Sequence, residues 1–200
     1  MKRVLAAGAL AAGLAAGLPP AARAQTGVEL RGSTAEYRFA DVNHTFPNGV
    51  MLDALYLGVP GQDEFYLGLG YTWKLSRGLT LIPLAYGVAG VQKGERGVVL
   101  GAYALSEAGP WTTIAFVGRF VRTSGGVATY DFVDSLDLTH RIAKKWHVGV
   151  SSSVYRQDTG WSHLTGPLVR RTDAKGSWGF SVRGGYDTEA RLVRILTFGS

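Results

Sequence analysis

The sequence predicts an all-β protein, an antiparallel up-and-down transmembrane β-barrel formed by a single domain over residues 25–200. Three observations predict this fold: an export signal, a strand with two unlike faces, and no later apolar run long enough for a membrane helix. The clearest strand runs from Glu64 to Lys74, where odd positions are apolar or aromatic and most even positions are charged, small or polar. Because side chains alternate across a strand, eleven residues at about 3.3 Å each suffice to cross a tilted bilayer.

Residues 1–24 have the organisation of a cleaved signal peptide. Lys2 and Arg3 form a charged start, residues 4–18 form an apolar run rich in Ala, Leu and Gly, and residues 22–24 read Ala-Arg-Ala, the pattern that signal peptidase cleaves. The apolar run has 15 residues, fewer than the roughly 18 to 20 that a membrane span needs. We therefore expect cleavage after Ala24.

The composition argues against several other classes of protein. The chain has 21 Lys and Arg against 15 Asp and Glu, and loss of Lys2, Arg3 and Arg23 with the signal leaves 18 basic residues and a charge of +3. This surplus is spread along the chain, whereas nucleic-acid binding needs a clustered basic face, so we expect no nucleic-acid partner. Cysteine is absent, so something other than disulfides stabilises the fold. The sequence indicates no cofactor.

Ten stretches carry the strand signal, and turn residues separate most of them. Ten strands is the favoured count, with eight and twelve open, because bacterial barrels have even strand numbers. Residues 28–31 and 164–171 are the segments that would raise the count to twelve. The ten stretches are residues 35–42, 50–59, 64–74, 79–92, 96–105, 112–122, 130–139, 146–155, 177–185 and 190–198.

The alternation also predicts which side chains face the membrane. In the stretch 79–92 the larger side chains at 82, 84, 86 and 88 are expected outside, opposite small side chains that suit a narrow interior. Asp134 falls on the apolar side of its stretch, and a β-bulge or a position at the membrane edge would explain it. The side chains expected to face the membrane include Tyr37, Phe39 and Phe120 and, above all, Phe65, Leu67, Leu69, Tyr71, Trp73, Phe116, Trp178 and Phe180.

The opposite strand faces define a polar interior of mixed charge. At eight to ten strands, a salt-bridged filling is favoured over a solute path, a preference that twelve strands would narrow. Arg170, Arg171 and Lys175 lie in a segment without clear alternation, where an outward loop would let them bind lipopolysaccharide phosphates, although a solvated loop is the simpler interpretation. The expected lumen residues are Glu36, Arg38, Glu64, Lys74, Arg119, Asp131, Asp137 and Arg183.

These features resemble those of small bacterial outer-membrane β-barrel proteins. The resemblance rests on the Ala-Arg-Ala signal end, the two-faced strands, tryptophans near strand ends, and a final strand ending Leu196-Thr197-Phe198. It implies residence in the outer membrane, contact with outer-membrane lipid and lipopolysaccharide, and insertion by the barrel-assembly machinery, which recognises a terminal aromatic residue, here Phe198. Gly199 and Ser200 follow Phe198 and depart from the usual pattern.

For function, the sequence favours a non-enzymatic barrel of structural, adhesive or minor-channel type whose small-molecule ligand is unknown. One alternative is an outer-membrane hydrolase acting on lipid or peptide, with His147, Ser151 and Asp137 as weak candidates, because a catalytic serine needs a base and the base needs an acid. His147 and Ser151 are two same-face steps apart, about 13 Å along a strand. No metal site is expected, because three or four ligands do not converge. The other alternative is a soluble periplasmic lipocalin-like binding barrel, with the apolar faces inside.

Overall fold

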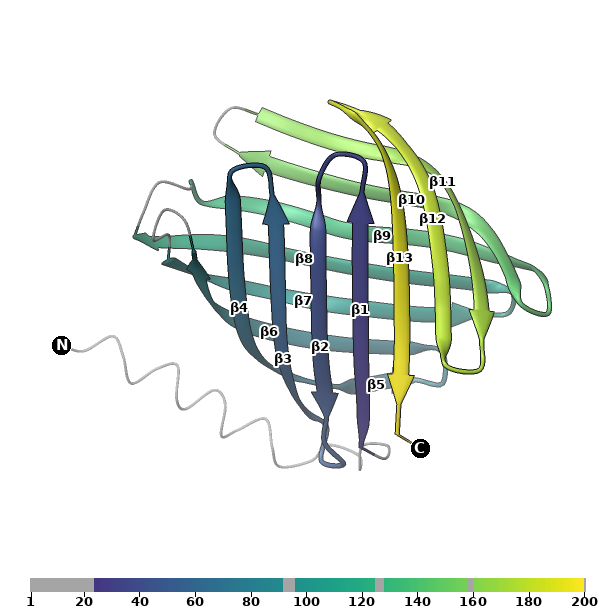
Figure 1. Ribbon diagram of the computed structural model, residues 1–200. Helices are drawn as coiled ribbons and strands as arrows, with labels where there is room; N and C mark the ends of the chain where they lie inside the picture. The colour runs from purple at the N-terminus through teal and green to yellow at the C-terminus, as the bar shows by residue number, and fades with distance from the viewer. Residues whose placement is uncertain (1–23, 92–95, 125–127, 158–159, 200) are drawn as a thin grey trace.

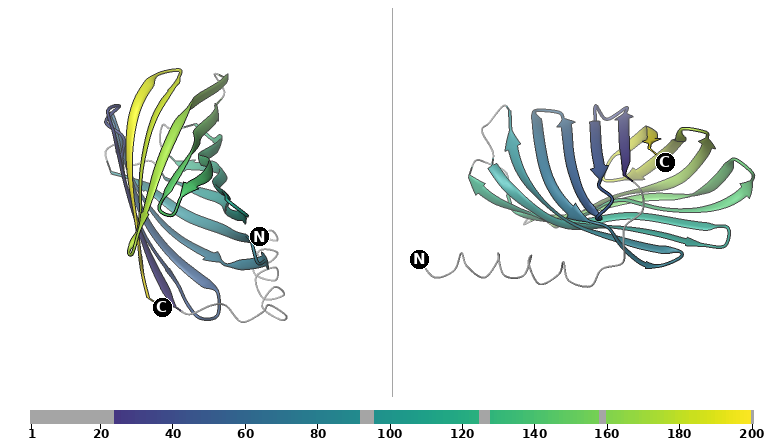
Figure 2. Two further views of the ribbon diagram at one scale, coloured as in Figure 1. Left: turned by 90° about the vertical axis from the view of Figure 1, so that its right-hand side faces the viewer. Right: turned by 90° about the horizontal axis from the view of Figure 1, so that it is seen from below.

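The computed structural model describes residues 24–91, 96–124, 128–157 and 160–199. The predicted signal peptide therefore lies outside the described residues, apart from Ala24. The described residues contain thirteen strands in one antiparallel sheet of order β4-β3-β2-β1-β13-β12-β11-β10-β9-β8-β7-β6-β5, and pairing of β4 with β6 closes the sheet into a barrel (Figures 1 and 2). No helix in this part of the chain is long and apolar enough to span a membrane.

The strands run up and down in chain order, and β1 pairs with β13 along the line where the two ends of the sequence meet. We call the end where β1 begins and β13 ends the terminus end; it is the lower end in Figure 1. The strands are β1 Gln25–Ser33, β2 Arg38–Thr45, β3 Val50–Val59, β4 Gln62–Tyr71, β5 Trp73–Ser76, β6 Leu79–Gly90, β7 Arg96–Ala108, β8 Trp111–Ser124, β9 Tyr130–Ala143, β10 Trp146–Gln157, β11 Gly160–Asp173, β12 Gly176–Gly185 and β13 Thr188–Phe198.

The closed barrel has twelve staves, because β5 continues β4 after Thr72 and both strands pair with β6. The antiparallel barrel is confirmed, the favoured count of ten is wrong, and twelve, the open alternative, is correct. The two missed strands, β1 and β11, contain the two segments that were open. Polar residues occur on both faces of β11, with Arg170 buried and Arg171 exposed, so its alternation is hidden in the sequence.

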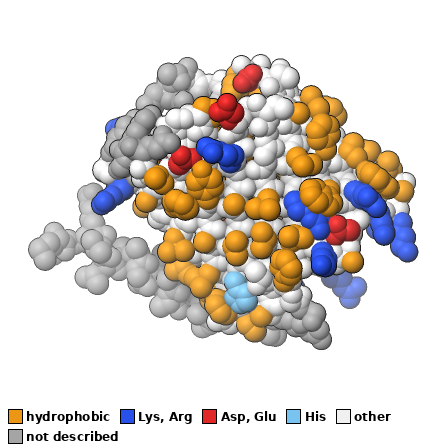
Figure 3. Space-filling view, viewed as in Figure 1, with side chains coloured by type: hydrophobic (Ala, Val, Ile, Leu, Met, Phe, Trp, Pro, Cys, Tyr) orange, Lys and Arg blue, Asp and Glu red, His pale blue; other side chains and the backbone are white. Residues whose placement is uncertain are grey.

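Apolar side chains cover much of the outer surface. On β4, Phe65, Leu67 and Leu69 are 55%, 71% and 58% exposed, and Phe180 of β12 is 49% exposed. Figure 3 shows hydrophobic side chains spread over the middle of the viewed face, with charged side chains toward its upper end and right-hand edge. Such a surface suits contact with hydrocarbon rather than with water.

Three strands present the opposite face to the one predicted. Phe39 on β2, Tyr86 on β6, and Phe116 and Phe120 on β8 are buried inside the barrel, each at most 9% exposed. On β6 the small side chains at positions 85, 87 and 89 lie outside instead. On β6 both faces are apolar, so alternation does not reveal which one is inside, and the large side chains fill the interior while Ala and Gly lie outside. On β2 and β8 the outer face instead carries an exposed arginine, Arg38 or Arg119.

A β-bulge at Ser135 explains the position of Asp134. Ser135 has a φ of +58°, and the register of β9 shifts at this point against both β8 and β10. Before the bulge Phe132 packs against the core, and after it Asp137 lies on the inner face. The β-bulge, one of the two explanations for Asp134, is therefore found.

Candidate functional site: the barrel lumen

The lumen contains two regions of different chemistry that meet at β9. One is lined by rings from β4, β6, β8 and β9, and the other by charged side chains from β1, β9, β12 and β13. We call the first the aromatic wall, which is Tyr66, Tyr86, Phe116, Phe120 and Phe132. We call the second the ionic cluster, which is Arg31, Asp134, Arg183, Glu189 and Arg191.

The rings of the aromatic wall contact one another around the barrel. Ring centroids lie 6.0 Å apart for Tyr66 and Tyr86, 6.4 Å for Tyr86 and Phe116, and 5.3 Å for Phe116 and Phe132. Four of the rings lie over glycines of a neighbouring strand, where a Cβ would fall only 2.3 to 2.8 Å from ring atoms. These glycines let the rings lie close to the barrel wall. The pairs are Tyr86 over Gly68, Phe120 over Gly97, Phe116 over Gly101 and Phe132 over Gly118.

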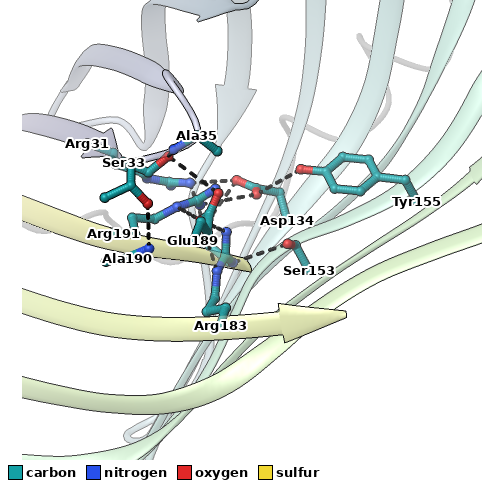
Figure 4. Close-up of polar contacts among 12 residues, drawn as sticks. Arg31, Ser33, Ala35, Asp134, Ser153, Tyr155, Arg183, Glu189, Ala190 and Arg191 are labelled. Atoms are coloured by element: carbon teal, nitrogen blue, oxygen red, sulfur yellow. Dashed lines mark hydrogen bonds and ion pairs between the residues drawn. The ribbon is translucent and has the colours of Figure 1, made fainter. Parts of the chain in front are cut away.

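A salt bridge of the ionic cluster crosses the lumen (Figure 4). Arg31 Nη1 on β1 donates to Asp134 Oδ2 on β9 at 2.6 Å, although four strands separate β1 from β9 in the sheet. Asp134 Oδ1 lies 3.9 Å from Arg191 Nη1 and accepts from the Tyr155 hydroxyl at 3.3 Å. The Arg31 guanidinium also lies 4.1 Å over the Phe39 ring. These contacts tie one side of the barrel to the other.

Glu189 is the second acidic centre of the ionic cluster. It accepts hydrogen bonds from the guanidinium groups of Arg183, one of them at 3.1 Å from Nε, and of Arg191, at 2.7 Å from Nε. Arg183 is completely buried and also donates to Ser153 Oγ at 3.1 Å. Buried charges of opposite sign are therefore paired and hydrogen-bonded here, as burial in a low-dielectric interior requires.

Below the ionic cluster and the aromatic wall, a cavity of about 380 Å³ extends toward the terminus end. We call it the acidic chamber, because Glu29, Asp41 and Asp53 on β1–β3 line one side of it. Glu29 pairs with Arg31 at 2.8 Å, whereas the described residues contain no salt bridge to Asp41 or Asp53. The opposite side carries Ile82, Tyr103, Leu105 and Ile114 from β6–β8.

Half of the eight predicted lumen residues lie in the interior. Glu64 and Arg183 are buried, Asp137 pairs with Arg170 at 2.5 Å, and Lys74 lines the acidic chamber while remaining exposed.

The other four predicted lumen residues are corrections. Arg119 and Asp131 form a 3.5 Å ion pair with side chains 62% and 43% exposed, outside the barrel between neighbours that point inward. Arg38, also exposed, pairs with Asp63 at 3.4 Å, and Glu36 lies in the exposed turn between β1 and β2. For Arg38, Arg119 and Asp131 the strand presents the opposite face to the interior from the one predicted. Glu36 lies in a turn where the sequence predicts a strand.

The predicted membrane-facing residues divide in a similar way. Phe65, Leu67, Leu69, Trp178 and Phe180 are exposed on the outer surface, and Tyr71 and Trp73 are half-buried. Phe116 is a correction, because its ring belongs to the aromatic wall and is 9% exposed.

The structure does not assemble the weak catalytic candidates into a site. Ser151 lies opposite Asp137 in the pairing of β10 with β9, but His147 lies opposite Arg141 and Arg170, four residues from Ser151. His147 Nδ1 is buried and has no hydrogen-bond partner among the described residues. No group of three or more His, Cys, Asp or Glu in the described part of the chain is arranged to hold a metal ion.

Sequence reasoning missed most of the ionic cluster, although a signal was present. Glu-x-Arg occurs three times. In Glu29 with Arg31 and in Glu189 with Arg191 the arginine Nε donates to the glutamate, at 2.8 and 2.7 Å, whereas Glu36 and Arg38 are exposed. Opposite charges two residues apart share one face of a strand. The spacing therefore predicts that the two charges of each pair share a face, but it does not by itself tell whether that face is the inner one, as on β1 and β13, or the outer one.

Comparisons with known proteins identify the fold. No family model matches the chain, and no curated protein matches its sequence. Among solved structures it is similar to a KdgM porin, with a TM-score of 0.62 and 10% identity over 87% of this chain and 99% of that one. It is also similar to a NanC porin, with a TM-score of 0.58 and 7% identity over 88% and 99%. The chain thus has the fold of bacterial outer-membrane porins, which confirms the resemblance at the level of architecture.

Proposed function

We propose that this chain is a non-enzymatic channel of the bacterial outer membrane that passes small solutes. The observation that carries the proposal is the acidic chamber, a cavity of about 380 Å³ with carboxyl groups on one side, inside a twelve-stave barrel whose outer surface is apolar. The exposed rings and leucines of β4 argue against the soluble lipocalin-like alternative, which needs those side chains inside. The separation of His147 from Ser151 gives no support to a hydrolase.

The terminus end of the barrel is proposed to face the periplasm. Outer-membrane barrels have short periplasmic turns. Four of the five hairpin connections at the terminus end contain two residues, and the fifth, between β2 and β3, contains four. In this orientation the acidic chamber opens toward the periplasm, and the predicted assembly signal Phe198, 47% exposed at the end of β13, lies on the periplasmic side.

The ionic cluster is proposed to restrict the passage. At its level the inner side chains from opposite sides are buried, including Phe39, Tyr86, Asp134 and Arg191, and the bridge from Arg31 to Asp134 spans the lumen. Solutes then pass only when this bridge rearranges. In this proposal the lumen has two states. With the Arg31–Asp134 bridge formed, salt bridges fill the lumen, and with the bridge rearranged, the lumen is open to solutes.

The neighbouring structures do not supply a substrate class for this chain. One of them is described as KdgM porin in complex with disordered oligogalacturonate, with a TM-score of 0.61 and 8% identity over 87% of this chain and 98% of that one. Recognition of a polyanion needs basic side chains free to pair with it. Here the buried arginines Arg31, Arg170, Arg183 and Arg191 each have a carboxylate partner.

Contact with lipopolysaccharide stays a proposal, but Arg170, Arg171 and Lys175 do not lie together to bind a phosphate group. Arg170 points inward to Asp137, Arg171 is exposed and lies over the Trp146 ring at 5.7 Å, and Lys175 is in the β11–β12 turn at the terminus end. The three basic groups therefore do not form one clamp on the outer surface.

Conductance of the purified protein in planar bilayers tests the channel. We expect the wild type to give small unitary steps in KCl, and Arg31→Ala with Asp134→Ala to give larger ones, because the pair that crosses the lumen is removed. The matched control is Arg119→Ala with Asp131→Ala, an ion pair on the outer surface, which should leave the steps unchanged. A folded double variant of the cross-lumen pair that conducts no better than protein-free lipid would contradict the channel and favour a structural barrel.

A further inference from the structure

The acidic chamber contains two buried carboxyl groups, Asp41 and Asp53, that form no salt bridge within the described residues. Asp41 and Asp53 are 3% and 2% exposed. One oxygen of Asp41 accepts from the Asn43 amide at 3.1 Å, and one oxygen of Asp53 accepts from the Tyr86 hydroxyl at 2.7 Å. The other oxygen of each, Oδ1, is buried without a hydrogen-bond partner among the described residues. A buried ionised carboxylate without a counter-charge is costly, so each group either binds a proton or is stabilised by a cationic partner from outside, and a cation that reaches this position competes with the proton.

The other residues that line the acidic chamber indicate what chemistry the rest of a bound ligand would have. The hydroxyl of Thr72 is a third buried polar atom without a partner in the described residues, and it also lines the chamber. Across from the acids, the wall from β6–β8 is apolar apart from Thr80 and includes the ring of Tyr103. Lys74 also lines the chamber, but it is exposed and forms no salt bridge within the described residues. Aromatic faces attract cations, and aliphatic side chains favour an apolar body. The cavity of about 380 Å³ lies within the range of about 300 to 1,000 Å³ that small-molecule pockets occupy.

We propose that the acidic chamber binds a small organic ammonium ion, with its amine against Asp41 and Asp53 and its apolar body against the β6–β8 wall. A bare metal ion fits less well, because the described residues offer no group of three or more metal-ligating side chains arranged around one point. The inference extends the proposed channel by naming a class of solute, but binding at equilibrium does not require conduction.

The test compares three probes of one shape with different charge, using the full barrel in lipid nanodiscs. Equilibrium dialysis against empty nanodiscs measures binding of 2-phenylethylammonium, 2-phenylethanol and phenylacetate after subtraction of partition into lipid. We expect the ammonium probe to bind at least about tenfold more tightly than the alcohol, and the anion to bind most weakly, because a charge-assisted hydrogen bond is stronger than a neutral one. Methylammonium, which lacks the apolar body, should bind more weakly than 2-phenylethylammonium.

Variants locate the preference for cations. Asp41→Asn with Asp53→Asn should remove the difference between the ammonium and alcohol probes, whereas Asp131→Asn, which changes an acid on the outer surface, should keep it. Equal binding of the two probes to the wild type would overturn the proposal and would mean that the two carboxyl groups are neutral and share protons. A preference that persists in the folded double variant would overturn it as well. The comparison of the three probes on the wild type does not depend on the folding of any variant. If the wild type prefers the ammonium probe but shows no conductance in planar bilayers, the proposed channel is contradicted and the proposed ammonium site is not.

Discussion

The aromatic wall and the ionic cluster fill the same lumen by different means, and the difference shows which interactions the sequence reveals. Rings of the aromatic wall hold their places by lying over glycines of adjacent strands, so their specificity comes from shape. The ionic cluster depends on directed bonds, such as the 2.6 Å bridge from Arg31 to Asp134. Small shifts of neighbouring atoms can preserve a packing contact at little cost in stability. Loss of the partner of a buried charge, in contrast, strongly destabilises the fold.

Single-residue deletions at β9 and β12 should give the largest contrast. Deleting Phe180 from β12, which alternates regularly, would turn Ser181 and Arg183 to the outer surface and leave Glu189 with one arginine fewer, because a slip of one residue inverts a strand. We expect no folded barrel, seen as loss of the heat-modifiable band on electrophoresis of the reconstituted protein.

Deleting Ser135 is the matched control for that experiment, because Ser135 is the extra residue of the β-bulge. Its removal leaves Asp134 and Asp137 facing inward and Leu136 facing outward, so the folded band should persist. Loss of the folded band in this variant, or its retention after deletion of Phe180, would show that the inner face of these strands is not what determines folding.

The same contrast explains what could be predicted from the sequence. Regular alternation of large apolar residues with small or polar ones gave the correct orientation of β10 and β12, where Ser151, Ser181 and Arg183 are buried. A charge alone was not sufficient, because Arg38, Arg119 and Asp131 lie on the outer surface. The errors fell on strands that contribute rings to the interior. On β6 both faces are apolar, and on β8 the face opposite Phe116 carries Arg119, which was expected inside, so only the closed barrel decides that Tyr86 and Phe116 point inward.

The residues of the candidate site could be predicted from the sequence only in part, for a related reason. Glu64, Asp137 and Arg183 were expected in the lumen, but the bridge from Arg31 to Asp134 joins strands that are far apart in both sequence and sheet order. Such a contact depends on the stave number and on the bulge at Ser135, which sets the face of Asp134. The acidic chamber likewise exists only because β1–β3 lie opposite β6–β8.

Removing one buried charge should have the next largest effect. Arg183→Met keeps the length of the side chain but removes the hydrogen bonds from Arg183 to Glu189 and Ser153 and leaves Glu189 with Arg191 as its one arginine partner, so the free energy of unfolding should fall by about 3 to 5 kcal/mol. Arg119→Met, in an exposed ion pair, should cost less than about 1 kcal/mol. Urea titration of both variants in lipid vesicles measures the difference. Equal stability of Arg183→Met and wild type would mean that packing alone suffices in the ionic cluster, as in the aromatic wall.

A smaller effect is expected where the aromatic wall is overpacked. Gly97→Ala places a Cβ 2.3 Å from the Phe120 ring, which is 1% exposed and stacked on Tyr130 at 5.3 Å, so the ring has to shift within a filled interior. Overpacking of this kind costs about 1 to 3 kcal/mol, measured by the same urea titration. Gly87→Ala on the outer face of β6 meets no atom within 4 Å and should leave stability unchanged. Adding Phe120→Leu should recover part of the loss in Gly97→Ala if the ring is the cause, and no recovery would place the strain in the backbone of β8 near Val121, whose carbonyl oxygen would lie 3.0 Å from the new Cβ.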